Sequence, residues 1–250
     1  MNVPGVGVQG FSADWPAPAG IRTWQTTRAG GVSTGRYESL NLAGHVGDDA
    51  VAVATNRARL RDLLELPAEP VWLEQVHGSR ILAADRGSDG EPADGAVAVA
   101  AGTVLVIMTA DCLPVLLTTR SGDAVGAVHA GWRGLAEGVI GAGVAALDRE
   151  PAEVLAWLGP AIGPDAFEVG GEVRDAFLRR YPAATACFIP NRRARWQADL
   201  YALARLALAE AGVTRVFGGG ACTHREAARF FSHRREAPCG RMATLIWRER

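Results

Sequence analysis

The 250-residue sequence predicts a mixed α/β fold of the α+β kind, a single-domain sandwich of mixed β-sheet with flanking helices. Two observations carry this prediction. Apolar β-type runs recur along the whole chain, and segments with helical spacing of apolar residues stand between them. No internal repeat, low-complexity tail or long linker divides the chain. We therefore expect one domain over residues 1–250, with its core at about 20–247.

The first part of the chain is expected to supply a strand, a loop and a helix. Residues 21–27 (IRTWQTT) read as a strand, and the Gly- and Ser-rich segment 28–41 reads as a loop that reaches towards a ligand. From Asp49 onwards, apolar residues recur at helical spacing behind this acidic cap, and Pro67 ends the pattern. This segment is predicted as a helix.

The middle of the chain is expected to supply the central sheet. Residues 71–84 resemble two short strands about a turn at Gly78, and a polar loop follows at 85–95. Three apolar β-type runs come next, the first two separated only by Asp111 and Cys112. These runs are 103–110 (TVLVIMTA), 113–119 (LPVLLTT) and 124–130 (AVGAVHA).

The second half continues with alternating helices and strands. After the motif GWRG we expect a helix of about 15 residues that ends near Glu150, and a Gly/Pro turn follows the next strand. A basic segment, 230–241, precedes the last strand. The further elements expected are strands at 154–159, 215–223 and 241–247, and helices near 171–181 and 199–211.

Composition limits the classes of partner. With 26 Lys and Arg against 27 Asp and Glu, the chain offers no electrostatic footprint for nucleic acid or for an anionic membrane. No apolar stretch approaches the roughly 18 residues of a membrane span, and the first residues do not read as a signal peptide. The four cysteines form no CxxC pair, so thiols are expected. We expect a cytoplasmic monomer that binds a small molecule.

Three side chains are candidates for a metal site. His77, Cys112 and His129 each stand where an apolar strand meets a turn, so a sheet can present them to one cleft. Two imidazoles and a thiolate form a catalytic zinc ligand set with a fourth position open for water, which the metal activates. Alternatively, each residue alone belongs to the core, since free cysteine is often a small buried hydrophobe. Copper also remains an alternative: no methionine is obviously placed as its axial ligand, but Met108 lies near Cys112 in the sequence.

Several arginines are candidates for binding an oxyanion, because the guanidinium fork binds phosphate through two donors. The five candidates fall in Gly-rich or polar turns, where simple surface solvation is the alternative for each of them. Asn41 brackets the expected ligand loop from the other side. The arginines are Arg28, Arg133, Arg234, Arg235 and Arg241.

The ordered motifs TTRAGGVS, SLNLAGHVGDD, EQVHGSRI, TADCLPVLL, AVHAGWRGLAEGV, GPAIGP and FFSHRR…GRMATLIW resemble the laccase-domain family, also called the multicopper polyphenol oxidase-like family. The resemblance runs from about residue 20 to residue 247. It implies a mixed α/β sandwich, not a cupredoxin barrel, and places the family's metal ligands on His77, Cys112 and His129. The C-terminal motif departs from the family pattern at His233 and Cys239, which affects the phosphate-binding assignments nearby.

The activity that this resemblance implies is zinc-dependent purine nucleoside phosphorolysis of adenosine, inosine, guanosine and S-methyl-5′-thioadenosine, together with adenosine deamination. Members are also described as peptidoglycan editing factors and as polyphenol oxidases. A leaving purine needs a proton, and Asp111 is the first candidate for this acid/base work because it adjoins Cys112; Glu168 is the second. A capping or structural role for Asp111 remains the alternative.

Other functions remain open at this stage. In a cysteine hydrolase acting on an amide or a peptidoglycan precursor, Cys112 is the nucleophile and His129 its base. A binding module would recognise a nucleotide-linked cell-wall precursor without turning it over. A copper-dependent polyphenol oxidase is the least favoured reading, since one His₂Cys cluster and three further histidines do not obviously house several coppers.

Overall fold

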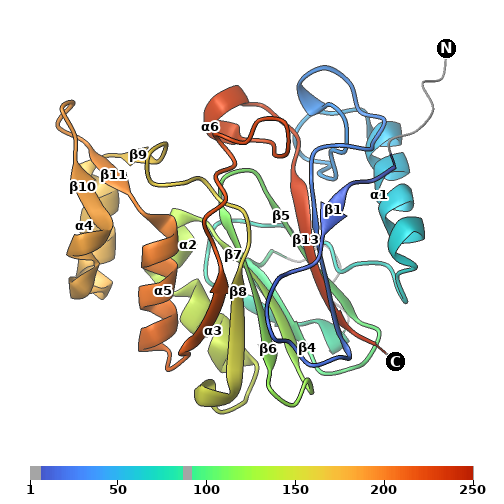
Figure 1. The fold of residues 1–250 in the computed structure, drawn as a ribbon, viewed down its shortest axis with the longest axis horizontal. Coiled ribbons are helices and arrows are strands. Elements are labelled where there is room, and N and C mark those ends of the chain that lie inside the picture. Colours follow the sequence, from blue (N-terminus) through green and yellow to red (C-terminus); the bar gives the residue numbers. More distant parts are fainter. Residues whose placement is uncertain (1–6, 87–91, 250) are drawn as a thin grey trace.

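Two β-sheets packed face to face, with helices on both outer faces, form the computed structural model of the protein, which describes residues 7–86 and 92–249 (Figure 1). One sheet contains, in spatial order, β1 (Gly10–Phe11), β2 (Ile21–Thr26), β13 (Met242–Arg248) and β5 (Val104–Thr109). The other contains β12 (Arg215–Gly218), β8 (Val154–Leu158), β6 (Leu113–Thr119), β7 (Val125–Ala130), β4 (Gly95–Ala98) and β3 (Ile81–Ala83). The predicted mixed α/β sandwich with flanking helices is confirmed.

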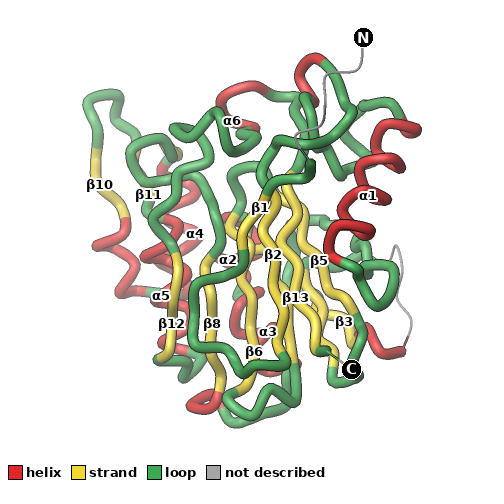
Figure 2. The backbone as a smooth tube through the Cα atoms, turned by 45° about the vertical axis from the view of Figure 1, so that its right-hand side comes forward, coloured by secondary structure: helices red, strands yellow, loops and turns green. Residues whose placement is uncertain are grey.

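Alternation of side chains along the strands produces the layers. In β5, Val106 packs in one core with Leu60 of α1 (Ala50–Leu64). Its neighbour Ile107 points the other way, into the core between the sheets, where it meets Leu116 of β6. Since successive strand residues face opposite sides, a strand buried on both faces must be apolar throughout, as these runs are. Figure 2 shows β2, β13 and β5 running side by side.

Helices cover the outer face of the six-stranded sheet. They are α2 (Trp132–Glu137), α3 (Val139–Ala146), α4 (Gly171–Arg180) and α5 (Leu200–Glu210). The single helix expected after GWRG, ending near Glu150, is wrong: it is divided at Gly138, which caps α2 with a left-handed φ of 94°. Such a φ suits glycine and ends α2 before α3 begins.

The expectation that 103–110 and 113–119 share one central sheet is also wrong. β5 belongs to the four-stranded sheet and β6 to the six-stranded sheet, so the chain crosses from one layer to the other between them. The crossing uses Asp111, whose φ of 88° lies in the left-handed region. A residue other than glycine rarely adopts this conformation, and it marks the crossing as a functional candidate.

The remaining differences are local. Residues 71–80 form bridges at Val71 and Glu74 but no strand. The sequence missed a small sheet of β10 (Phe188–Pro190), β11 (Trp196–Ala198) and β9 (Glu168–Val169), and a short helix, α6 (His233–Glu236). Short 3₁₀ helices span Gly35–Tyr37, Ala84–Arg86, Pro151–Glu153 and Pro182–Cys187. Residues 1–6 of the N-terminal segment and 87–91 of the expected loop lie outside the described residues.

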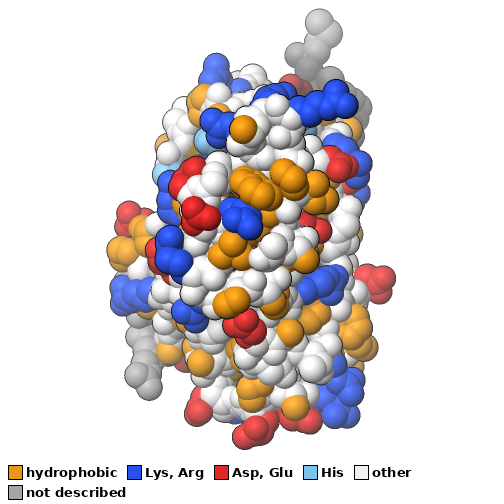
Figure 3. Space-filling view, turned by 90° about the vertical axis from the view of Figure 1, so that its left-hand side faces the viewer, with side chains coloured by type: hydrophobic (Ala, Val, Ile, Leu, Met, Phe, Trp, Pro, Cys, Tyr) orange, Lys and Arg blue, Asp and Glu red, His pale blue; other side chains and the backbone are white. Residues whose placement is uncertain are grey.

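The surface mixes both signs of charge. On the face drawn in Figure 3, basic, acidic and hydrophobic side chains interleave, in keeping with a formal net charge of −1. Among the helices of the described residues, none combines the length and the apolar character that crossing a bilayer requires.

Candidate metal centre

His77, Cys112 and His129 converge at the edge of the sandwich where the chain crosses between the sheets. Cys112 immediately precedes β6, and His129 lies in β7 opposite Pro114 of β6. His77 comes from the segment before β3. One ligand atom from each residue lies within 4.8 Å of the other two. The sequence prediction that three distant side chains meet at one point is therefore confirmed in its geometry.

The spacing of the donors fits a tetrahedral ion. Ligands bound at about 2.0 Å and 2.3 Å lie about 3.5 Å apart when the angle at the metal is tetrahedral. Cys112 Sγ lies 3.8 Å from His77 Nε2, and the rings of His77 and His129 are 4.8 Å apart between centroids. An ion therefore needs only small shifts to reach all three donors.

Gly131 leaves the space in which this cluster sits. A Cβ on Gly131 would lie 2.8 Å from His77 Cδ2, closer than real Cβ contacts, and 3.2 Å from Cys112 Sγ, which is also tight. Its backbone has an ordinary extended conformation, so glycine is needed here for space and not for its φ. The glycine cradle and the mixed imidazole and thiolate donors both fit a zinc site with one open position.

The thiol and the imidazole adjust each other's protonation in the protein without metal. Burial raises the pKa of Cys112, but the neighbouring His129 and His77 outweigh this effect and lower it to about 6. Burial lowers the pKa of His129, while the Cys112 thiolate and the Asp94 carboxylate outweigh it and raise the pKa to about 9. A thiolate beside an imidazolium is consequently the favoured state near neutral pH.

A cavity of about 430 Å³ opens onto the cluster. Its walls include Trp132 and Phe167, which offer aromatic surface, and His45. Burial, followed by the charges of Arg241 and Arg57, lowers the pKa of His45. Pockets of this size with a few convergent polar groups hold small molecules. A larger hollow of about 690 Å³, lined by Trp15, Trp24 and Trp247 among others, shares no residue with this cavity.

Asp111 lines the same cavity but is also bound by its own chain. Its Oδ1 accepts a hydrogen bond of 2.6 Å from Thr223 Oγ1. Its Oδ2 accepts bonds from Ser232 Oγ at 3.1 Å and from the Arg234 backbone N–H at 2.7 Å. Asp111 is the one carboxylate among the residues that line the cavity. It therefore links the segment that carries α6 to the crossing between the sheets.

Three of the predicted arginines line the cavity. Arg133 lies over the ring of Trp132, with 4.5 Å between its Cζ and the ring centroid. Arg234 donates through one nitrogen to the carbonyl of Glu168 at 3.0 Å, and Arg241 donates through one nitrogen to carbonyls next to it in the chain. The other guanidinium nitrogens of Arg234 and Arg241 have no hydrogen bond to the described residues, which leaves donors for a ligand.

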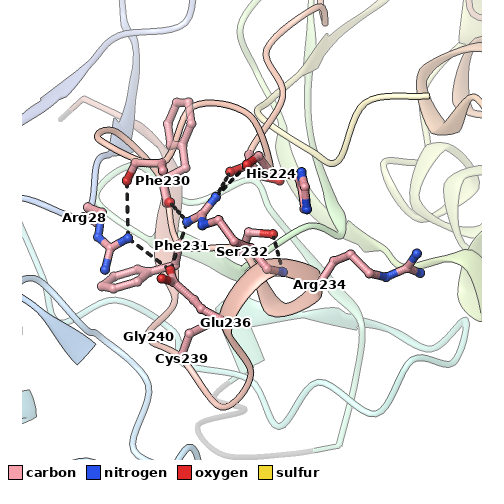
Figure 4. Close-up of polar contacts among 12 residues, drawn as sticks. Arg28, His224, Phe230, Phe231, Ser232, Arg234, Glu236, Cys239 and Gly240 are labelled. Atoms are coloured by element: carbon pink, nitrogen blue, oxygen red, sulfur yellow. Dashed lines mark hydrogen bonds and ion pairs between the residues drawn. The ribbon is translucent and has the colours of Figure 1, made fainter. Parts of the chain in front are cut away.

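The remaining predicted binding residues hold the fold together. Arg28 binds Glu236 and lies over the ring of Phe231 (Figure 4). Arg235 donates to the carbonyls of Thr223, His224 and Phe230 and to Glu236. Asn41 is fully buried, where it binds Ala43, Asp48 and the Arg241 backbone. None of Arg28, Arg235 and Asn41 lines the cavity, whereas Arg234 extends away from this network in Figure 4.

Glu168, the second acid/base candidate, is not brought into the cavity. Its carboxylate accepts a hydrogen bond of 2.8 Å from Asn191 and lies 3.6 Å from Arg193. It lines a neighbouring hollow that Arg234 separates from the metal cavity. The reason is local: Phe167, directly before β9, takes the position facing the site, and the next side chain turns away.

The sequence did not single out Asp94, which contacts both histidines of the cluster. Its Oδ1 lies 2.7 Å from Nδ1 of His129 and accepts the backbone N–H of His77 at 2.9 Å. From the sequence, Asp94 falls in the polar loop expected at 85–95, and it was assigned no role. Gly131 and Trp132 were also missed as site residues, although both stand in the motif GWRG directly after His129.

A two-sheet α/β sandwich with a His/Cys/His cluster at the crossing between its sheets is the class of protein that the fold and the site define. The chain belongs to the family described as multi-copper polyphenol oxidoreductase laccase, whose model matches residues 22–249. The resemblance drawn from the sequence is thereby confirmed. Within the described residues, His77, Cys112 and His129 form one such ligand group, while a multicopper centre requires more than one.

Relatives of known sequence and structure cover almost the whole chain. A purine nucleoside phosphorylase of Pseudomonas aeruginosa is 52% identical over 238 residues, covering 95% of this chain and 97% of that protein. The purine nucleoside phosphorylase YfiH of Escherichia coli is 50% identical, covering 93% and 96%. The crystal structure of a Neisseria meningitidis protein, 48% identical, matches with a TM-score of 0.93 and covers 96% of this chain and 99% of its own.

Proposed function

We propose that this protein is a zinc-dependent purine nucleoside phosphorylase that uses the His77, Cys112 and His129 site. The observation that carries the proposal is one cavity of about 430 Å³ that joins this cluster to arginines with unused donors. The names of the relatives from Pseudomonas aeruginosa and Escherichia coli support the reaction. The substrates proposed are adenosine, inosine, guanosine and S-methyl-5′-thioadenosine, each with inorganic phosphate.

The residues around the cavity suit the two halves of this substrate pair. Arg133, Arg234 and Arg241 offer fixed donors to phosphate, for which the guanidinium group is well shaped. Trp132 and Phe167 offer flat apolar surface to a purine ring, which stacks well on aromatic side chains. A bound zinc ion would supply Lewis-acid polarisation at this end of the cavity.

In phosphorolysis the bond from ribose C1′ to the purine nitrogen breaks, and a phosphate oxygen forms a new bond to C1′. The purine leaves with a proton, and the charge that develops at C1′ must be stabilised. Asp111 is our candidate for moving this proton, because it is the carboxylate among the residues lining the cavity. The hydroxyls of Thr223 and Ser232, both bonded to Asp111, hold its carboxylate in place. We also propose adenosine deamination at the same site.

Incubation of purified, metal-quantified protein with inosine and phosphate tests this proposal. Hypoxanthine and ribose 1-phosphate should accumulate in equal amounts, and both should disappear in His77→Ala. The matched control is Arg120→Met, at an exposed ion pair with Glu153 outside the cavity. Product formation that is unchanged in His77→Ala would show that the reaction does not use this metal site.

A second function, a cysteine hydrolase, is favoured by the pairing of Cys112 with His129. The lowered pKa of Cys112, about 6, resembles that of a thiol activated by an imidazole. Iodoacetamide separates the two functions. In zinc-loaded protein, phosphorolysis requires that Cys112 be protected from alkylation, while a nucleophilic Cys112 should be modified rapidly and lose activity. In metal-free protein, both functions predict that the rate of Cys112 modification reaches half its maximum near pH 6, where half of the thiol is ionised.

A further inference from the structure

Asp94 is fully buried at the start of β4, between the two histidines of the metal centre. Its carboxylate accepts four hydrogen bonds from the described chain. One comes from the imidazole Nδ1 of His129, and three come from consecutive backbone N–H groups. The backbone donors belong to Val76, His77 and Gly78, at 3.3, 2.9 and 2.6 Å. A buried carboxylate therefore has partners on all sides.

The backbone bonds bear on the conformation of the first histidine. His77 has a left-handed φ of 63°, an uncommon conformation for a residue with a side chain. Three N–H groups that surround one anion form a concave cradle, and the cradle keeps the chain in this bend. The three bonds to the carboxylate therefore hold the His77 backbone towards the cluster, where its exposed ring meets the ring of His129.

The side-chain bond bears on the second histidine. An ionised carboxylate only accepts hydrogen bonds, so His129 must carry a proton on Nδ1. Nε2 is then the atom left for a metal ion. The backbone supports the same arrangement, because the His129 N–H donates to the Asp94 carbonyl at 2.7 Å.

We propose that Asp94 is the positioning residue that orients both histidine ligands, by holding the Nδ1–H of His129 so that Nε2 faces the metal and by holding the backbone bend of His77. It touches neither substrate nor the reacting atoms. The inference rests on the metal site of the proposed function but is independent of the reaction performed there. Partners of this kind behind ligating histidines affect metal affinity strongly.

The variant Asp94→Asn tests the proposal because it preserves shape while adding donors. An amide has one acceptor oxygen, so its N–H₂ group must face either Nδ1 of His129 or the backbone N–H groups of Val76 and Gly78, and the support of one histidine is lost in either orientation. Zn²⁺ affinity, measured by competition with a chelator, should fall about 10- to 100-fold. Co²⁺ added alone should give a weaker thiolate charge-transfer band than in the unchanged protein.

Asp123→Asn is the matched control. Asp123 also accepts hydrogen bonds from two hydroxyls and an arginine, but it lies in the turn between β6 and β7, away from the cluster. Its loss should lower thermal stability and leave Zn²⁺ affinity unchanged. If Asp94→Asn binds Zn²⁺ as tightly as the unchanged protein, or if both variants lose affinity equally, the proposal is wrong.

A measurement without substitution covers the case in which Asp94→Asn does not fold. In zinc-loaded protein labelled with ¹⁵N-histidine, His129 should show a slowly exchanging proton on Nδ1. A proton on Nε2 instead overturns the proposal. If Zn²⁺ binds with this proton on Nδ1 but no phosphorolysis occurs, the proposed function is wrong and the role of Asp94 stands. If Zn²⁺ does not bind at all, both the proposed function and the role of Asp94 are wrong.

Discussion

At the scale of single residues, Asp111 and Cys112 stand together because the chain changes sheets there. Strand neighbours point to opposite faces, but the left-handed φ of Asp111 breaks this alternation. The thiol can therefore face the histidines while the carboxylate binds Thr223 and Ser232. One acid and one thiol thus serve two different parts of the same cavity.

Gly131→Ala tests whether space at the cluster is essential. The new methyl group would press on His77 and Cys112, and because Gly131 has ordinary backbone angles, no backbone strain accompanies it. Zn²⁺ affinity should fall by about tenfold or more, since ligating atoms must reach the ion to within a few tenths of an ångström. Isothermal titration of metal-free protein measures this loss.

Gly141→Ala in α3 is the matched control, because nothing lies within 4 Å of its added methyl group. It should bind Zn²⁺ as the unchanged protein does, and gain slightly in helix propensity. Equal affinity in all three proteins would contradict the crowding argument.

The convergence of the three candidate ligands could be expected from sequence, most clearly for Cys112 and His129, which stand at the ends of apolar runs. The role of Asp94 could not be expected, because an acid between Ala93 and Gly95 before a strand looks like part of a polar turn. Arg28 and Arg235 show the opposite error. Their place in polar segments suggested ligand binding, but their donors are used by carbonyls and by Glu236 inside the fold.

At the scale of elements, the segment that carries α6 forms a roof over the cavity, and Arg235 holds it. Arg235→Met keeps the length of the side chain but leaves carbonyls of Thr223, His224 and Phe230 without their donor. One hydrogen bond from a charged donor contributes about 1.5–3 kcal/mol, and the bonds of a single guanidinium are not additive, so we expect destabilisation of about 2–4 kcal/mol in total. Calorimetry should show a melting temperature lower by roughly 5–10 °C.

Arg235→Met should also weaken the binding of phosphate by the α6 segment. Arg234 and His233 belong to α6 and line the cavity, so KM for phosphate should rise more than kcat falls. Arg120→Met, at an exposed pair, should change stability by no more than about 0.5 kcal/mol. If the melting temperature of Arg235→Met lies within about 1 °C of that control, Arg235 does not hold the α6 segment in place.

Elements with one clear signal were predicted well. The helix behind Asp49 begins where its cap predicts, and Asp49 accepts hydrogen bonds from Val51 and Ala52. The helix after GWRG was predicted too long, because Val139–Ala146 continues the apolar pattern of α2 after a break at Gly138. The spacing of apolar residues cannot reveal that one glycine in an otherwise helical run adopts a left-handed conformation.

At the scale of the whole molecule, the presence of two layers could be expected, but not which strands belong to each. A strand buried on both faces is apolar at every position, so its sequence does not show which neighbour each face meets. β5 and β6, only a few residues apart, therefore looked like partners in one sheet. The pairing of β13 with β2 and β5 joins the chain's end to its start and middle, a contact that no local pattern reveals.

At the end of the sandwich away from the candidate metal centre, Asp123 in the turn between β6 and β7 holds neighbouring segments together by hydrogen bonds. β6 starts beside Cys112 and runs seven residues, so this turn lies about 20 Å from the site. Hydrogen bonds from Thr119, Arg149 and Ser121 hold the pKa of Asp123 well below its usual range. Because Arg149 follows α3, the carboxylate links the helical layer to the sheet.

The sign of the resulting pH dependence follows from linkage. A carboxyl group whose pKa is lower in the folded protein stabilises the fold above its unfolded pKa, about 3.9, and this contribution is lost as the pH falls below that value. Asp123→Asn should therefore cost about 1 kcal/mol at pH 7, a small value because the side chain is 44% exposed. The difference between the two proteins should shrink towards zero between about pH 4 and pH 2. Urea unfolding at a series of pH values measures it, and two curves that stay parallel down to pH 2 would show that Asp123 does not contribute through its charge.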